Sequence, residues 1–277
     1  MSTFDPLADL AILVLVSLVP ALIYLTWVRR VERFQQSSWG SILGAFAYGA
    51  LFATVVAAIL ETIVVALGTT VSQQYPGPEF LFLNGNSTLG AFFLVLIVAP
   101  FVEEGLKGSG VYSYRDQIRS VADGPVFGAS VGLGFGFFET LLYGLAAYLA
   151  GGLEAGIVLI LVRSVSSVLL HGSSTGMFGY GFARSRFHVP GAGTGSYYLV
   201  AVAMHAGFNA LASLAAIVVF FGFSGVAVDL ASYLALFAAI AFAFAAIEHV
   251  RHVIASADYP ALLPGSSNLR PPPGPGR

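Results

Sequence analysis

Long apolar runs constrain this chain more than any other feature of its sequence. Seven stretches of roughly 20 residues or more carry few charges, at about residues 8–28, 40–68, 89–111, 124–149, 156–182, 196–221 and 226–250. A helix needs about 20 apolar residues to cross the hydrocarbon core of a bilayer. We therefore predict an all-α fold, a polytopic transmembrane helix bundle of about seven spans.

The composition excludes the main alternative classes. Only 9% of the 277 residues are charged and 57% are hydrophobic, whereas a soluble domain carries about 25% charged residues. The alternating segments of about 10 residues that are typical of a transmembrane β-barrel are absent from the sequence. The chain has no Cys, which excludes disulfides, Cys-based metal sites and a thiol nucleophile but leaves the redox compartment open.

The basic residues predict an orientation in the cell membrane. Outside the apolar runs they lie in alternate connections, at Arg29, Arg30 and Arg33, at Arg115 and Arg119, at Arg184 and Arg186, and at Arg251, Arg270 and Arg277. By the positive-inside rule the N-terminus is outside and the C-terminus is cytoplasmic. The first run is not expected to be a cleaved signal, because no Lys or Arg precedes it.

The domain organisation is simple. Residues 1–250 form a single transmembrane helical domain whose motif-bearing core lies at about 90–215. Residues 251–277 are rich in Pro and are expected to form a disordered cytoplasmic tail. The external connection 69–88 contains the sequon Asn86-Ser87-Thr88, where a plain turn is the favoured interpretation and glycosylation stays open.

Ionisable side chains within the apolar runs are the features that indicate function. Each costs roughly 2.5–3.5 kcal/mol at membrane depth, so such residues pair, bind a cofactor or catalyse. The set is Glu61, Glu103, Glu104, Lys107, Glu139, Arg163, His171 and His205, with Asn209 one turn after His205. Glu61 and Arg163 lie nearer the outer side, where we expect a structural ion pair between them.

The remaining residues predict a metal site. Two His and one carboxylate, with water in a fourth position, are typical of catalytic zinc, and Glu139, His171 and His205 supply that set. A further carboxylate is then needed as general base, and Glu103 and Glu104 offer two. Lys107 lies three residues after Glu104 and four after Glu103, so it can form an ion pair with one of the two carboxylates. Asn209 can form a hydrogen bond with a ligand or stabilise an oxyanion. We place the base on Glu103.

Simpler interpretations exist for each residue alone. A single buried His is often an interhelical hydrogen-bond partner, and Glu104 with Lys107 can be a neutralised ion pair. Taken together, three carboxylates and two His with one Lys nearby leave surplus negative charge. A divalent cation removes that surplus, which favours a metal site.

Four short motifs carry a family resemblance. The sequence "EEGLK" at 103–107 matches EExxK, "FGFFE" at 135–139 matches FxxxE, "HAGFN" at 205–209 resembles HxxxN/D, and "LLHGSSTGMFGYG" at 169–181 resembles the His-containing segment between them. In this order, over about residues 90–215, they resemble the PrsW family of intramembrane metalloproteases. That family shares a clan with the CAAX prenyl endopeptidases and the Abi proteins, whose EExxxR and FxxxH patterns match less well.

The resemblance implies an activity and a set of roles. It implies an intramembrane metalloendopeptidase that cleaves membrane-associated protein substrates with a metal-activated water, and it points to Glu103, Glu104, Lys107 and Asn209 as catalytic residues. Glu139, His171 and His205 would bind the metal, with Zn2+ the expected ion. The expected partners are the lipid bilayer and a membrane protein or peptide substrate, and no nucleic acid.

Three alternatives stay open. A rhomboid-type serine protease could use Ser130 in "GASVG" with His205, although small-residue helix packing is the favoured interpretation of that stretch. A non-catalytic scaffold is possible, because the pattern also resembles the multi-span scaffold subunit of γ-secretase. A proton- or ion-coupled transporter is less favoured, since the chain shows no inverted repeat.

Overall fold

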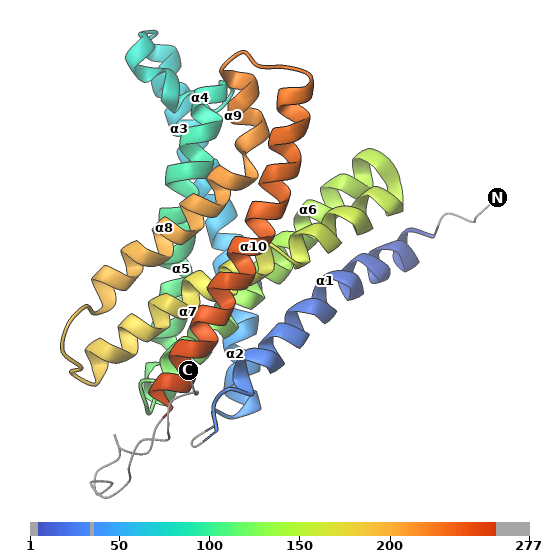
Figure 1. The fold of residues 1–277 in the computed structure, drawn as a ribbon. Coiled ribbons are helices and arrows are strands. Elements are labelled where there is room, and N and C mark those ends of the chain that lie inside the picture. The colour runs from blue at the N-terminus through green and yellow to red at the C-terminus, as the bar shows by residue number, and fades with distance from the viewer. Residues whose placement is uncertain (1–4, 34–35, 259–277) are drawn as a thin grey trace, which may run out of the picture.

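The protein is a bundle of long helices (Figure 1). The computed structural model describes residues 5–33 and 36–258, and this part of the chain contains helices and connections but no strand. The α-helices are α1 (Pro6–Arg29), α2 (Trp39–Ala47), α3 (Thr54–Gln74), α4 (Thr88–Phe93), α5 (Ala99–Ser113), α6 (Asp123–Ser164), α7 (Ser167–Arg186), α8 (Thr194–Ala212), α9 (Leu214–Phe220) and α10 (Val226–Ala257). The all-α prediction is confirmed.

The number of spans agrees with the sequence once one long helix is divided. By length and hydropathy, five stretches among the described residues can cross a membrane, or six if the bent pair α8 and α9 is one span. One of these stretches covers 64 residues, from Asp123 to Arg186. It is interrupted at Gly152, where φ is 82°, and its two arms lie side by side. About seven crossings result, as predicted.

Glycines hold the two arms of this hairpin together. A Cβ atom on Gly124, Gly128 or Gly132 would overlap the backbone carbonyl of Gly179, Thr175 or His171, respectively. Small residues at every fourth position allow such close helix approach inside a membrane. The close packing fixes the register of α6 against α7 and therefore the depth of His171.

Three helices are irregular near the centre of the bundle. Residues Tyr48–Ala53 (η1) and Leu94–Val98 (η3) form π-helical turns between α2 and α3 and between α4 and α5. Pro100, which has no backbone N–H, lies two residues after the end of η3. The third irregularity is a bend of 62° between α8 and α9. The π-helical turns are of a kind that often occurs at functional sites.

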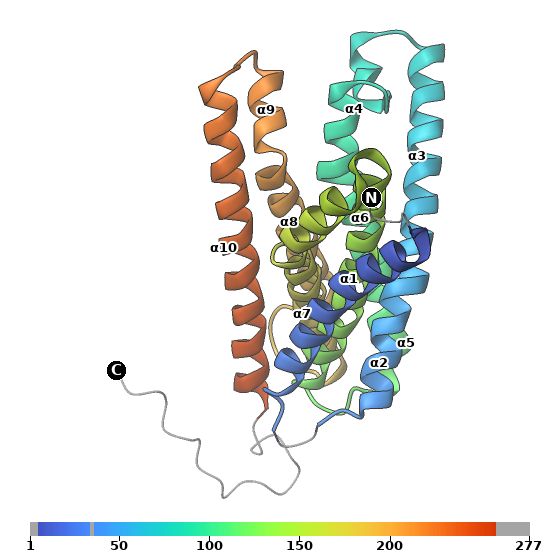
Figure 2. The ribbon, with the colours of Figure 1, turned by 90° about the vertical axis from the view of Figure 1, so that its right-hand side faces the viewer.

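The connections gather at two ends of the bundle. The links α1–α2, α5–α6 and α7–α8 lie at the end where α10 finishes, and these are the predicted Arg-containing connections (Figure 1). The links α3–α4 and α9–α10 lie at the other end. Figure 2 shows α3 and α10 on opposite flanks with α6, α7 and α8 between them. The alternation of basic connections predicted from the sequence is therefore present in space.

The C-terminal boundary of the bundle differs from the prediction. Helix α10 continues to Ala257, so the tail does not begin at 251. Arg251 lies over the Trp27 ring at 4.1 Å and Ile254 is buried, and these contacts extend the helix. The predicted disorder of residues 259–277 lies outside the described residues.

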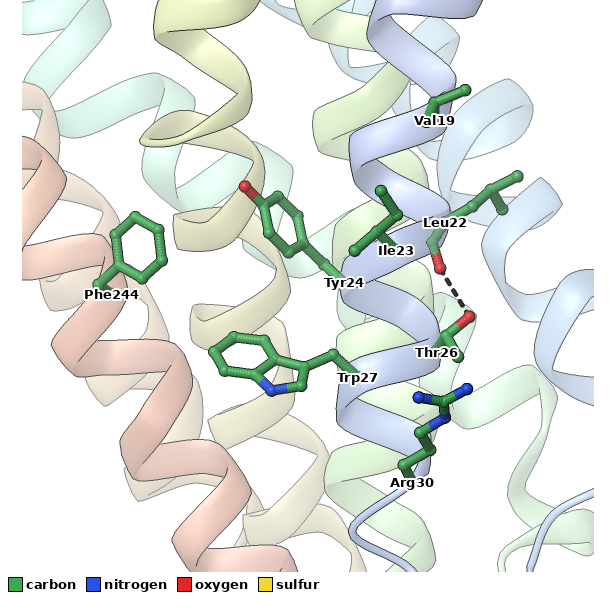
Figure 3. Close-up of a pocket in the computed structure, with 8 residues that line it drawn as sticks. All are labelled: Val19, Leu22, Ile23, Tyr24, Thr26, Trp27, Arg30 and Phe244. Atoms are coloured by element: carbon green, nitrogen blue, oxygen red, sulfur yellow. Dashed lines mark hydrogen bonds between the residues drawn. The ribbon is translucent and has the colours of Figure 1, made fainter.

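An open apolar groove separates α1 from α10 (Figure 3). Its lining is Val19, Leu22, Ile23, Tyr24, Thr26, Trp27, Arg30 and Phe244. The groove faces the apolar exterior of the bundle and contains none of the predicted site residues. The candidate site lies elsewhere, between α3, α5, α6, α7 and α8.

Candidate active site

Helix α5 brings three charged side chains into the interior. Glu103, Glu104 and Lys107 are all buried, and the Glu104 and Lys107 side chains have no exposed surface. The spacing of i+3 and i+4 places both carboxylates within reach of the ammonium group. The helix presents this face to α7 and α8 rather than to lipid.

Glu104 accepts hydrogen bonds at both of its carboxylate oxygens. Its Oε1 atom accepts hydrogen bonds from Lys107 Nζ at 2.7 Å and Ser174 Oγ at 2.9 Å. Thr175 Oγ1 donates to Oε2 at 3.2 Å. His205 Nδ1 lies 3.1 Å from Oε1. A carboxylate with this many donors is a structural anchor that ties α5 to α7 and α8.

The two imidazoles face each other in the same layer. The ring centroids of His171 and His205 are 4.9 Å apart, and the rings are nearly perpendicular. His171 Nε2 lies 2.8 Å from Glu139 Oε2, and His171 Nδ1 lies 2.9 Å from Lys107 Nζ. Because carboxylates accept and ammonium groups donate, Nε2 of His171 carries hydrogen and Nδ1 accepts. Each imidazole is thus oriented by a carboxylate on one nitrogen.

Glu103 has a different environment from its neighbour. Its Oε2 atom is buried and, among the described residues, has no hydrogen-bond partner. It lies 3.7 Å from Lys107 Nζ, 3.9 Å from His171 Nδ1 and 3.8 Å from His205 Nε2. With His205 Nδ1 donating to Glu104, His205 Nε2 is an acceptor, so two acceptors face each other with no donor between them. This gap suits a cation or a water molecule.

A metal fits this donor set. Glu103, His171 and His205 offer ligand atoms that all lie within 4.8 Å of one another. Imidazole and carboxylate are the ligands that zinc uses in Cys-free sites. Glu139 contacts His171 but lies outside this three-residue group.

Glu139 forms an ion pair with Arg163, which was expected from the sequence to pair with Glu61. Arg163 donates to Glu139 Oε2 at 2.7 Å and to Ser167 Oγ at 3.0 Å. The predicted pair of Glu61 with Arg163 is therefore wrong. The physical reason is the hairpin in α6, whose register places Arg163 opposite Glu139, and Arg163 also lies over the Tyr143 ring at 4.0 Å.

Two further predicted residues are placed as follows. Asn209 lines the site, and its Nδ2 donates to the Val95 carbonyl in η3 at 2.8 Å.

Ser130 is fully buried and donates to the Val126 carbonyl at 2.7 Å. Ser130 therefore packs within α6, as the small-residue interpretation expected, and the structure gives no support to a serine nucleophile.

The carboxylates and imidazoles line one cavity of about 230 Å³. Its polar wall is formed by Glu61, Glu103, Glu139, Arg163, Ser167, His171, His205 and Asn209. Its other walls come from Leu94, Val95 and Ala99 around η3, and from Phe208, Ala212 and Ser213 at the bend between α8 and α9. The irregular turns of the bundle thus border the site.

Sequence reasoning missed Ser174 and Thr175, which bind Glu104. A signal was present, because both hydroxyl residues lie about one turn after His171 and therefore near the same face of the helix. Their position facing α5 required the register of the α6–α7 hairpin.

Fold and cluster together define a polytopic helical membrane protein with a buried cluster of carboxylates and imidazoles inside its spans. Comparison with known proteins agrees with this class. Residues 37–243 match the profile of the PrsW family intramembrane metalloproteases. The chain belongs to this family.

A curated relative carries the same name. "Protease PrsW" of Shouchella clausii (strain KSM-K16) is 29% identical over 178 residues, which cover 63% of this chain and 70% of the relative. No solved structure matches the chain. Family membership confirms the resemblance read from the four motifs and supports a protease of the membrane.

Proposed function

We propose that the chain is an intramembrane metalloendopeptidase that hydrolyses peptide bonds of membrane-associated protein substrates. The observation that carries this proposal is the buried cavity in which Glu103, His171 and His205 meet. It is supported by membership in the PrsW family. We expect the N-terminus outside and the C-terminus in the cytoplasm, as the basic connections indicate.

Two His and one carboxylate would hold a divalent metal ion, for which zinc is the best fit. The carboxylate is Glu139 in the assignment from the sequence, and Glu103 is the alternative, since its ligand atom lies within 4.8 Å of those of His171 and His205. Such an ion, when bound, supplies a Lewis acid that polarises the scissile carbonyl and activates water. Glu139 already touches His171, and Arg163 balances its charge. Glu104 orients His205 in the same way, as carboxylates orient metal-binding imidazoles in other sites.

Glu103 is proposed to accept the proton of the attacking water. Its Oε2 atom is the buried acceptor without a partner, whereas Glu139 and Glu104 are already satisfied by donors. A general base must lie within hydrogen-bond reach of the proton that it takes. The distances from Glu103 Oε2 to both imidazoles, 3.8 and 3.9 Å, support this role, because they leave room for a water molecule between these groups.

Metal content and cleavage, measured together on purified protein in detergent, test this proposal. About one metal ion per chain is expected, lost in His171→Ala and His205→Ala but kept in the matched variant His249→Ala, whose side chain is exposed. Glu103→Gln should abolish peptide cleavage and retain the metal, whereas Glu139→Gln should lose the metal.

The remaining outcomes separate the alternatives. Loss of metal in Glu103→Gln, with retention in Glu139→Gln, would make Glu103 the third ligand and leave Glu139 to orient His171. Cleavage by fully metal-free protein would overturn the metal assignment. A folded wild-type protein that binds no metal and cleaves no substrate would favour the scaffold interpretation.

A further inference from the structure

Glu61 is a cavity residue that neither the motifs nor the proposed chemistry uses. It lies on α3 and lines the same cavity as Glu103, Glu139 and Arg163. Helix α3 is outside the motif-bearing core predicted from the sequence. An ionisable residue at membrane depth is retained when it has a partner or a function.

The carboxylate of Glu61 has no partner in the described part of the chain. Its Oε1 atom is sealed from solvent and forms no hydrogen bond. The basic residues nearby bind other groups. Arg163 donates through Nη2 to Glu139 and Ser167, and its buried Nε has no partner among the described residues. Lys107 donates to Glu104. Leaving the buried Oε1 atom of this half-buried carboxylate without a donor costs free energy, so this oxygen suits a donor from outside the chain.

The cavity limits what that donor can be. Its volume of about 230 Å³ is below the ~300–1,000 Å³ of pockets that bind drug-sized ligands. The cavity therefore suits one side chain of a substrate and some water. An isolated carboxylate in the wall of a protease pocket selects a basic side chain, as Asp does in the specificity pocket of trypsin.

We propose that Glu61 forms a recognition subsite for a Lys or Arg side chain of the substrate, next to the peptide bond that is cleaved. This inference rests on the proposed function. Glu103 and Glu61 line one cavity, so a substrate whose scissile bond lies at Glu103 and the imidazoles can place an adjacent side chain at Glu61. The substrate class is then a transmembrane or juxtamembrane segment that carries a basic residue near the cleavage position.

Substrate preference tests the subsite. Apolar peptides of about 20 residues, in detergent, carry a single Lys or a single Gln at each of several scanned positions. Wild-type protein should cleave the best Lys peptide with a kcat/KM at least about tenfold above its Gln counterpart, the order expected for one charge-assisted hydrogen bond. Glu61→Gln keeps an acceptor but removes the charge, so it should bring this ratio close to one. Glu154→Gln, at an exposed position of α6, should leave the ratio unchanged.

Binding separates failure of the subsite from failure of the proposed function. In the Glu103→Gln background, the labelled Lys peptide should bind about tenfold more tightly than the Gln peptide, and adding Glu61→Gln should remove the difference. Equal binding of the two peptides, or a Lys preference that persists without the Glu61 charge, would overturn the subsite. Glu61-dependent binding without cleavage by the wild-type protein would retain the subsite and overturn the protease proposal.

Discussion

Lys107 donates a hydrogen bond to Glu104 over 2.7 Å but lies 3.7 Å from Glu103. The two carboxylates are adjacent in the chain and about 100° apart around the helix, so the single ammonium group binds one and leaves the other. Glu104 is thereby fixed in a network with α7 and α8. Glu103 keeps an unpartnered oxygen in the cavity, which is the property that a general base needs.

Substitution of Lys107 by Met should destabilise the protein strongly. It leaves Glu104 buried without its cation, and breaking a buried ion pair by removing one partner costs about 3–5 kcal/mol. The measurement is the thermal unfolding midpoint in detergent, compared with Arg186→Gln, which removes a partly exposed cation. An unchanged midpoint for Lys107→Met would contradict the proposed anchoring role of the Glu104 network.

Lys107 is also the only lysine in the sequence, and its side chain is fully buried. An amine-reactive reagent should therefore label the side chain of Lys107 only when the bundle opens. Labelling that follows the thermal transition would confirm that the network and the fold are lost together.

Substitution of Arg163 by Gln should reduce activity strongly and destabilise the fold less than Lys107→Met does. Arg163 holds Glu139, which in turn contacts His171 at 2.8 Å. Partners that orient metal-binding residues typically contribute 10–100-fold to metal affinity or activity. We expect a fall of that size in kcat/KM and in metal affinity. The unfolding midpoint should fall less than for Lys107→Met, because the side chains of Arg163 and Glu139 are each 19% exposed. An Arg163→Gln protein with wild-type activity would show that Glu139 needs no such support.

The depth of each site residue could be predicted from the sequence. The length of the apolar runs and the rise of a helix place Glu103, Glu139, His171 and His205 in a shared layer, and the structure brings them together around one cavity. The motifs also identify the family, because they combine residue type, spacing and order. The division of roles among the carboxylates stays a prediction.

The rotation of each helix about its own axis and the irregular turns within the helices could not be predicted from the sequence. Glu61 and Arg163 lie at compatible depths, yet depth does not say which way a side chain points around its helix. The turn at Gly152 and the π-helical turns η1 and η3 depend on packing between helices. One sequence feature was related to the hairpin. The glycine spacing in "GASVGLGFG" allows the close contact that fixes the register of α6 against α7. This register places Arg163 opposite Glu139 rather than Glu61.

Substitution of Gly132 by Ala should disrupt the site through the backbone. The added Cβ would overlap the carbonyl oxygen of His171, and backbone cannot move aside without separating α6 from α7. The shift displaces His171 from Glu139 and Lys107, so activity should fall more than tenfold and the unfolding midpoint should drop, as overpacking typically costs 1–3 kcal/mol.

Gly207→Ala is the matched control for that substitution. Gly207 lies between His205 and Asn209 on α8, where an added Cβ meets no atom within 4 Å. Ala is favoured over Gly inside a helix by about 1 kcal/mol, so this variant should be as stable as wild type or more so. Equal behaviour of Gly132→Ala and Gly207→Ala would show that close approach of α6 to α7 is not required.

Stability should also depend on pH through Glu32, which follows α1 outside the helical spans. Its side chain is fully buried. Burial and the neighbouring carboxylate of Asp123 raise the pKa of Glu32 from 4.5 to about 8, and the hydrogen bond from the Ser37 amide at 2.8 Å only partly opposes this. Between pH 4.5 and about 8, Glu32 therefore retains a proton in the folded protein that it has lost in the unfolded chain.

The sign of the effect follows from proton linkage. A folded-state pKa above the unfolded value stabilises the fold below pH 4.5, and this contribution is lost as pH rises through about 8. The unfolding midpoint in detergent, measured from pH 5 to pH 9, should therefore fall across this window and then level off. Glu32→Gln mimics the protonated carboxyl and should flatten this part of the profile, whereas the exposed Glu154→Gln should preserve it. An identical pH profile for wild type and Glu32→Gln would show that Glu32 is ionised in the folded protein, and that the links between α1, α2 and α6 tolerate its buried charge.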